Sequence, residues 1–148
     1  MIESDEFGPF RGQMLVPDEN GRRITRVMLE KIDGAWQGAS TLFLNTKQLR
    51  AGGVRIAMDS SGKTIYYAST TRGWQSPDEG LQRITYNGKT PFHIKTFNLT
   101  TQGFTFDFTL PVTETEKLLE KISVNSFCYE YGYRYGSSEK DKKEHNIL

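Results

Sequence analysis

Short strand-forming runs separated by glycine turns dominate this chain and restrict what it can fold into. Asn20-Gly21, Asp33-Gly34 and Asn87-Gly88 are dipeptides typical of tight turns between antiparallel strands, and Ser61-Gly62 separates two more apolar runs. Between the first two turns, every second residue from Ile24 to Ile32 would lie on one face of a strand. The spacing predicts an all-β fold built from small antiparallel sheets.

Residues 1–95 are predicted to form about two blades of a β-propeller. The stretch "GVRIAMDSSGKTIYYAS" has the form apolar strand, aspartate, glycine turn, apolar strand. Strands this short and this apolar are expected where neighbouring blades cover both faces, whereas a strand with one wet face alternates more regularly. A propeller blade takes about 40–45 residues and closure takes at least four blades. Two blades would therefore be an incomplete propeller.

The pattern changes near residue 96, and residues 96–148 are predicted to begin an immunoglobulin-like β-sandwich. Phe104, Phe106 and Phe108 alternate with polar residues, as in a half-buried strand. The segment 113–122 carries helix formers, with a capping-box pattern at Thr113 and Glu116. The segment 124–136 alternates again and places several tyrosines on one face. A sandwich of this type has about seven strands, so this part is also expected to be incomplete.

Composition excludes several classes of protein and site. The 148 residues hold 19 basic and 18 acidic side chains, without the basic excess of a nucleic-acid binder. No apolar run is long enough for a transmembrane helix, and the first ten residues lack the apolar region of a secretory signal. Cys128 is the only cysteine, so no internal disulfide can form, and we expect it to be a small buried hydrophobe. Neither histidine has a metal-ligand spacing, so no metal site is predicted.

Three segments carry a resemblance to a known family. "GPFRGQMLVPD", "GVRIAMDSSGKTIYYASTTRGW" and "GLQRITYNGKTPFHI" resemble the closing blades of bacterial quinoprotein glucose/sorbosone dehydrogenase-like β-propellers. "LTTQGFTFDFTLPV" and "YEYGYRYGSSEKD" are similar to the Ig-like sandwich that follows the propeller in those proteins. The resemblance implies a fragment of a larger exported, periplasmic or extracellular protein. Its partners would be the remaining blades and modules of the same polypeptide.

The resemblance also implies a chemistry for the parent protein. Such propellers use pyrroloquinoline quinone (PQQ), often with calcium, to oxidise a sugar or alcohol, and haem c is carried on another module. The family's catalytic histidine lies on an earlier blade, and no C-x-x-C-H motif occurs here. We therefore expect no catalytic residue and no cofactor on this chain, which would be structural. The alternative is a non-enzymatic propeller and sandwich scaffold that binds carbohydrate or protein.

Four residues are candidates for ligand binding. Arg72 offers a planar fork of donors suited to the carboxylates of a quinone cofactor, and Trp74 can stack on a flat ring. The competing interpretation packs the indole between blades and leaves the guanidinium on a carbonyl or a nearby carboxylate. Tyr133 and Tyr135 belong to the tyrosine-rich stretch, which is either the inner face of a sandwich or a sugar-binding platform. They become better candidates for sugar binding if they lie beyond the cover of the sheet.

Overall fold

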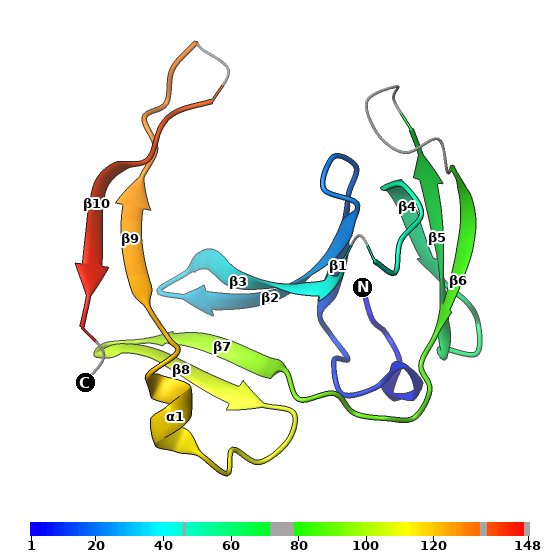
Figure 1. The fold of residues 1–148 in the computed structure, drawn as a ribbon, viewed down its shortest axis with the longest axis horizontal. Helices are drawn as coiled ribbons and strands as arrows, with labels where there is room; N and C mark the ends of the chain where they lie inside the picture. The colour runs from blue at the N-terminus through cyan, green and yellow to red at the C-terminus, as the bar shows by residue number, and fades with distance from the viewer. Residues whose placement is uncertain (46, 72–78, 134–135, 147–148) are drawn as a thin grey trace. The chain divides into compact units, whose positions relative to one another are not determined.

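The computed structural model describes the chain except residues 46, 72–78, 134–135 and 147–148. It confirms the predicted all-β class, with several small antiparallel sheets and no closed barrel among the described residues. The chain forms two compact units, Met1–Pro111 and Val112–Leu148 (Figure 1). The predicted domain boundary at 95/96 falls inside the first unit, within strand β7 (Ile94–Thr100). No helix in the described part of the chain has the length and apolarity needed to cross a bilayer.

The first sheet is a three-stranded meander in the order β1-β2-β3. Its strands are β1 (Met14–Asp18), β2 (Arg23–Ile32) and β3 (Ala35–Leu44), and a short 3₁₀ turn, η1 (Asp5–Phe7), precedes them. Asp33 and Gly34 join β2 to β3 with φ angles of 48° and 83°. Positive φ at both central residues is what a type I′ hairpin turn requires, and the Asp-Gly pair supplies it. The predicted face of β2 is also observed, because Ile24, Arg26 and Met28 are all buried.

The second sheet is also a three-stranded meander, with the order β4-β5-β6. Its strands are β4 (Gly52–Met58), β5 (Thr64–Thr70) and β6 (Gly80–Thr85). The first strands of the two sheets, β1 and β4, contact each other. Gly52 permits this approach, because a Cβ there would overlap the carbonyl of Glu19, just beyond β1. The neighbouring Gly53 packs in the same way, since a Cβ there would overlap Tyr67 and Pro17.

The third sheet is the hairpin of β7 and β8 (Gly103–Phe108), which contacts the first sheet through β2 and β3. The hairpin turns at Gly103, which has a φ of 140° and is paired with Thr100. The predicted hairpin at Asn87-Gly88 is not formed. Gly88 does turn the chain with a φ of 80°, but the flanking strands β6 and β7 belong to different sheets. This segment is a connection between sheets, and Tyr86 at its start packs against the core cluster and next to Gly8.

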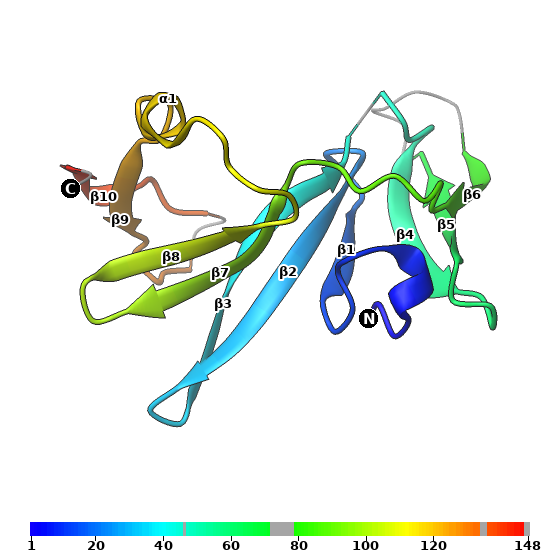
Figure 2. The same cartoon turned by 90° about the horizontal axis from the view of Figure 1, so that it is seen from below.

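The core of the first unit is a cluster of buried residues that includes members of η1, β2 and β5. Figure 2 shows η1 between β1 and β4. Tyr67 is fully buried in this cluster, and its hydroxyl donates to the carbonyl oxygen of Ala51 at 2.7 Å. Because the hydroxyl is hydrogen-bonded, burial of the aromatic ring stabilises the fold through the hydrophobic effect and leaves no buried polar atom unpaired. The buried members of this cluster are Ile2, Phe7, Phe10, Ile24, Leu49, Ile65 and Tyr67.

The second unit holds one short helix, α1 (Thr115–Leu119), and the hairpin of β9 (Val124–Cys128) and β10 (Lys140–His145). The helix is shorter than predicted, and the expected capping box is not formed, because Glu114 is the N-cap residue and makes no side-chain cap bond. Strand β10, which is highly charged, was not predicted. Cys128 is exposed, so the expectation of a buried cysteine is wrong. The reason is that the two-stranded hairpin has no described layer of its own unit over Cys128, whose thiol instead faces Asp141 on β10.

Candidate functional site

The four residues predicted to bind a ligand have different outcomes. Arg72, Trp74 and Tyr135 lie outside the described residues, so they stay predictions. Tyr133 is described and is 95% exposed, in the segment that follows β9. It therefore lies beyond strand β9, and this position makes Tyr133 a better candidate for sugar binding than it would be inside a sandwich.

Exposed tyrosines gather in the segment between β9 and β10. Tyr129, Tyr131 and Tyr133 have exposed fractions of 62%, 105% and 95%. Strand β9 ends at Cys128, so the predicted tyrosine-lined strand stops before these residues begin. Tyr131 and Tyr133 border a shallow hollow of about 330 Å³ together with polar groups. An exposed ring beside hydroxyl and charged groups can stack on a sugar face while its neighbours bond the sugar hydroxyls.

A buried cation is the most unusual feature of the first unit. Arg26 on β2 has no exposed surface. Its Nη1 atom donates to the side-chain oxygen of Gln13, and its Nη2 atom donates to the carbonyl oxygen of Ile94 and to Thr41 Oγ1, the latter at 3.2 Å. A weaker bond of 3.4 Å runs from Nη1 to the carbonyl oxygen of Lys95. These bonds hold the β7–β8 hairpin against the first sheet.

His93 is a further hydrogen-bond partner of the Arg26 guanidinium. Its Nδ1 atom lies 3.0 Å from Arg26 Nη2, and its Nε2 atom lies 2.9 Å from the carbonyl oxygen of Leu42. A guanidinium can only donate, so Nδ1 accepts and the ring proton lies on Nε2, which donates to Leu42. His93 is therefore a neutral structural ligand of Arg26. In the sequence, His93 lies close to the predicted boundary at 95/96. In the fold, its contacts with Arg26 and Leu42 give it a role in packing.

The charge on Arg26 is not balanced by an acid. No described carboxylate pairs with it, and its Nε atom is buried without a hydrogen-bond partner. Burial lowers the pKa of the Arg26 guanidinium to about 10, so the side chain is still charged at neutral pH. The ring of Phe10 covers the guanidinium, with 3.9 Å from Cζ to the ring centroid, and supplies a cation–π contact. No sequence pattern indicated this cluster, because Arg26 was only one residue of an alternating strand.

A pocket of about 310 Å³ lies next to this cluster in the first unit. Phe10 and His93, the two rings that contact Arg26, are part of its lining. Most of the wall is apolar, and the connection after β6 contributes polar side chains, among them Asn87 and Lys89. The lining consists of Phe7, Phe10, Phe43, Leu44, Ile84, Thr85, Tyr86, Asn87, Lys89, Pro91 and His93.

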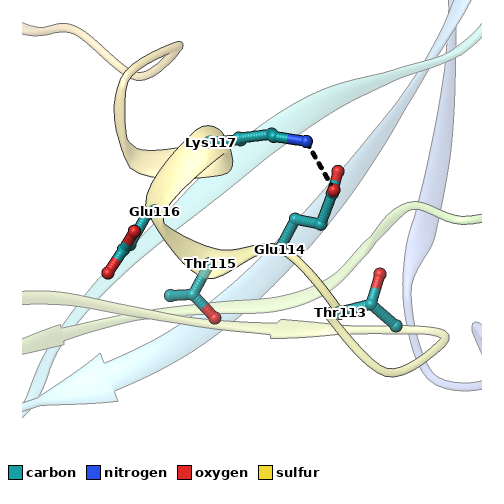
Figure 3. Close-up of a pocket in the computed structure, with 5 residues that line it drawn as sticks. All are labelled: Thr113, Glu114, Thr115, Glu116 and Lys117. Carbon is teal, nitrogen blue, oxygen red and sulfur yellow. Dashed lines mark hydrogen bonds and ion pairs between the residues drawn. The ribbon is translucent and has the colours of Figure 1, made fainter.

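A further hollow at the start of α1 is not a site. Figure 3 shows Thr113, Glu114, Thr115, Glu116 and Lys117 around it, with Lys117 Nζ paired to Glu114 Oε1 at 2.6 Å. The two side chains that carry opposite charge neutralise each other at the surface. The helix has only five residues, too few for an appreciable dipole at its N-terminus.

The resemblance places PQQ and calcium on the parent protein and not on this chain. No group of three histidine, cysteine or acidic side chains converges in the described part of the chain, as calcium would need. The buried guanidinium that could face a quinone carboxylate is already committed to Gln13, His93 and backbone carbonyls. We therefore derive no step through PQQ or calcium on this chain.

No family model matches the chain, and comparisons with curated proteins and with solved structures also found no match. Its function is therefore inferred from its own residues.

Proposed function

We propose that the chain is a structural, non-catalytic part of a quinoprotein glucose/sorbosone dehydrogenase-like protein and supplies two consecutive propeller blades. The observation that supports this proposal is the contact between β1 and β4, the first strands of two meanders with the same order. In a propeller, the first strand of each blade lies innermost, so the first strands of neighbouring blades approach each other around the channel. Gly52 and Gly53 give β4 the bare backbone that this approach needs.

Exposed apolar side chains on both sheets also support the proposal. Trp36 and Leu42 on β3 and Leu81 on β6 are between 47% and 69% exposed. Apolar residues on the outer strands are what further blades would cover. On this proposal, the partners of the chain are the remaining blades of the same polypeptide, and the whole protein is exported.

The test is to express the complete polypeptide that contains this sequence, load it with PQQ and calcium, and follow dye reduction with a panel of aldoses and polyols. We expect sugar-dependent reduction that requires the quinone. Absence of reduction with every sugar would overturn the dehydrogenase assignment. The structural role of this part has a separate readout, because Gly52→Ala should lower the thermal stability of that protein without changing its KM.

A second candidate function is favoured by the tyrosines after β9. Tyr131 is fully exposed and Tyr133 nearly so, beside the polar groups of Ser137 and Lys140. On this alternative, the chain is a non-enzymatic module that binds glycans by stacking sugar faces on these rings. Screening the chain against immobilised glycans tests it. Tyr131→Ala should abolish any binding, whereas Tyr66→Ala, which removes a partly exposed ring on β5, should leave it unchanged.

A further inference from the structure

The pocket beside Arg26 has walls suited to an aromatic or branched apolar group. Phe7 and Phe10 are almost completely buried and belong to the core, so this side of the pocket is held in place by packing. Phe43 contacts both rings, with centroid distances of 6.2 and 6.1 Å. A volume of about 310 Å³ is at the lower end of the range for small-molecule sites, which suits a compact ligand.

Two of the polar side chains that line the pocket, Lys89 and Asn87, offer hydrogen-bond donors. Lys89 lines it and makes no ion pair with any described residue. Asn87 also lines it; its side-chain oxygen accepts the backbone N–H of Lys89 at 3.0 Å, which leaves the amide NH₂ to donate elsewhere. The hydroxyl of Tyr86, another residue that lines the pocket, is 3.2 Å from Thr90 Oγ1.

The charge around the pocket favours an anion. Among the described residues, no acidic side chain lines it, and the acids of the neighbouring η1 are paired, Asp5 with Arg11 at 2.7 Å and Glu6 with Lys63 at 3.2 Å. Arg26, which has no described acidic partner, contacts two lining rings, Phe10 and His93. The field of these positive charges attracts a negative group at the exposed side chain of Lys89.

From these observations we infer that the pocket binds a small monocarboxylate with an aromatic or branched apolar body. The body lies against Phe7, Phe10 and Phe43, and the carboxylate faces Lys89 and Asn87. Arg26 adds a favourable field without touching the ligand, because its donors point to Gln13, Thr41, His93 and Ile94. The inference does not depend on the proposed dehydrogenase role, since every group in it belongs to the first unit of this chain.

The test uses fluorine NMR titration of the purified chain with 4-(trifluoromethyl)phenylacetate. The matched probes are its neutral amide and 4-(trifluoromethyl)benzylamine, which keep the ring and change the charge. We expect saturable binding of the carboxylate, an affinity for the amide that is about three- to tenfold weaker, and the weakest binding for the amine. Amide shifts of the ¹⁵N-labelled chain should cluster at the lining residues.

Two substitutions in the pocket and one control outside it make the test specific. Lys89→Gln should weaken carboxylate binding to the level of the amide and leave amide binding unchanged, while Lys47→Gln, at an exposed lysine outside the pocket, should change neither. Thr85→Trp should fill the mouth of the pocket and block both probes. If no probe binds, or if shifts map to the second unit, the inference is overturned. Equal binding of all three probes, unaffected by Lys89→Gln, would also overturn it and would indicate an apolar hollow that another polypeptide segment fills.

Discussion

The Nη2 atom of Arg26 lies 3.0 Å from the Nδ1 atom of His93, although 67 residues separate them in the chain. Because the guanidinium must donate, this contact makes the neutral imidazole an acceptor, and the opposite nitrogen donates to the backbone of Leu42. A single buried side chain thus connects β2, β3 and the start of β7. The cohesion of the first unit depends on polar bonds at this point and not on apolar packing alone.

Replacing Arg26 is expected to destabilise the chain strongly. Arg26→Ala leaves the carbonyl of Ile94 and the side chain of Gln13 without their donor and opens a cavity, so the free energy of unfolding should fall by about 3–4 kcal/mol. Arg26→Met keeps most of the volume and removes the buried charge, and should cost about 1–2 kcal/mol less than alanine. Urea denaturation measures both. Arg83→Ala on β6, at an exposed position, is the control and should change stability by less than about 0.5 kcal/mol.

Gly52 is expected to tolerate no side chain. A Cβ would overlap the carbonyl oxygen of Glu19, and a backbone atom has no freedom to move aside. Gly52→Ala should therefore cost about 2–3 kcal/mol through separation of β1 from β4. The matched control is Gly132→Ala, where nothing lies within 4 Å. Thermal denaturation compares them, and equal melting temperatures would contradict the close approach of the two strands.

The Tyr67 hydroxyl should contribute stability that is lost at alkaline pH. Burial is the main cause that raises the pKa of Tyr67 above 10.0, with the charge of Asp18 adding to it. Above pH 10.0 the unfolded chain therefore releases this proton before the folded chain does, so the free energy of unfolding falls as the pH rises. Tyr67→Phe should cost about 1 kcal/mol at pH 7, by loss of the bond to Ala51.

The difference between wild type and Tyr67→Phe should then narrow above pH 10.0, as urea denaturation at several pH values would show. Arg26 acts in the opposite direction, because its pKa is lowered to about 10 from 12.5 and the folded chain releases that proton first. Its contribution is present in both proteins and cancels in the comparison. A difference that stays constant with pH would contradict the burial of the hydroxyl.

Asp18 should make stability depend on pH in the acid range. Its Oδ1 atom accepts the Gly21 N–H at 2.8 Å and Oδ2 accepts Arg23 Nε at 2.7 Å. The bond from Gly21 is the largest cause that lowers the pKa of Asp18 below 3.8. A lowered pKa means that the stabilisation is present above 3.8 and is lost as the pH falls through the folded value.

Asp18→Asn is therefore expected to cost about 1 kcal/mol at pH 7, and the difference from wild type should disappear as the pH falls below 3.8. Asp5→Asn, which removes an exposed pair with Arg11, should cost less than about 0.5 kcal/mol at pH 7. Denaturant titrations from pH 2.5 to pH 7 measure the two variants. A cost for Asp18→Asn that persists at the lowest pH would show that shape, and not charge, is what the turn needs.

Local patterns in the sequence were enough to predict much of the strand content. Alternation placed Ile24, Arg26 and Met28 on one buried face, and Asp33-Gly34 predicted a hairpin that has the required positive φ angles. These features depend on neighbours along the chain, so a sequence window contains their cause. Asn87-Gly88 shows the limit, because the same turn chemistry there links two different sheets. Whether two strands pair is decided by what else can cover them.

The candidate sites depended on tertiary structure. The sequence by itself determined an all-β chain with tight turns, one cysteine and balanced charge. Only the fold brought Gln13 and His93 to Arg26, ended β9 before Tyr129, and set the bare backbone of Gly52 against Glu19. Side-chain periodicity indicates that a residue faces inward, but not which distant segment meets it there. That choice is made by packing, because buried polar groups must find partners wherever the assembled sheets place them.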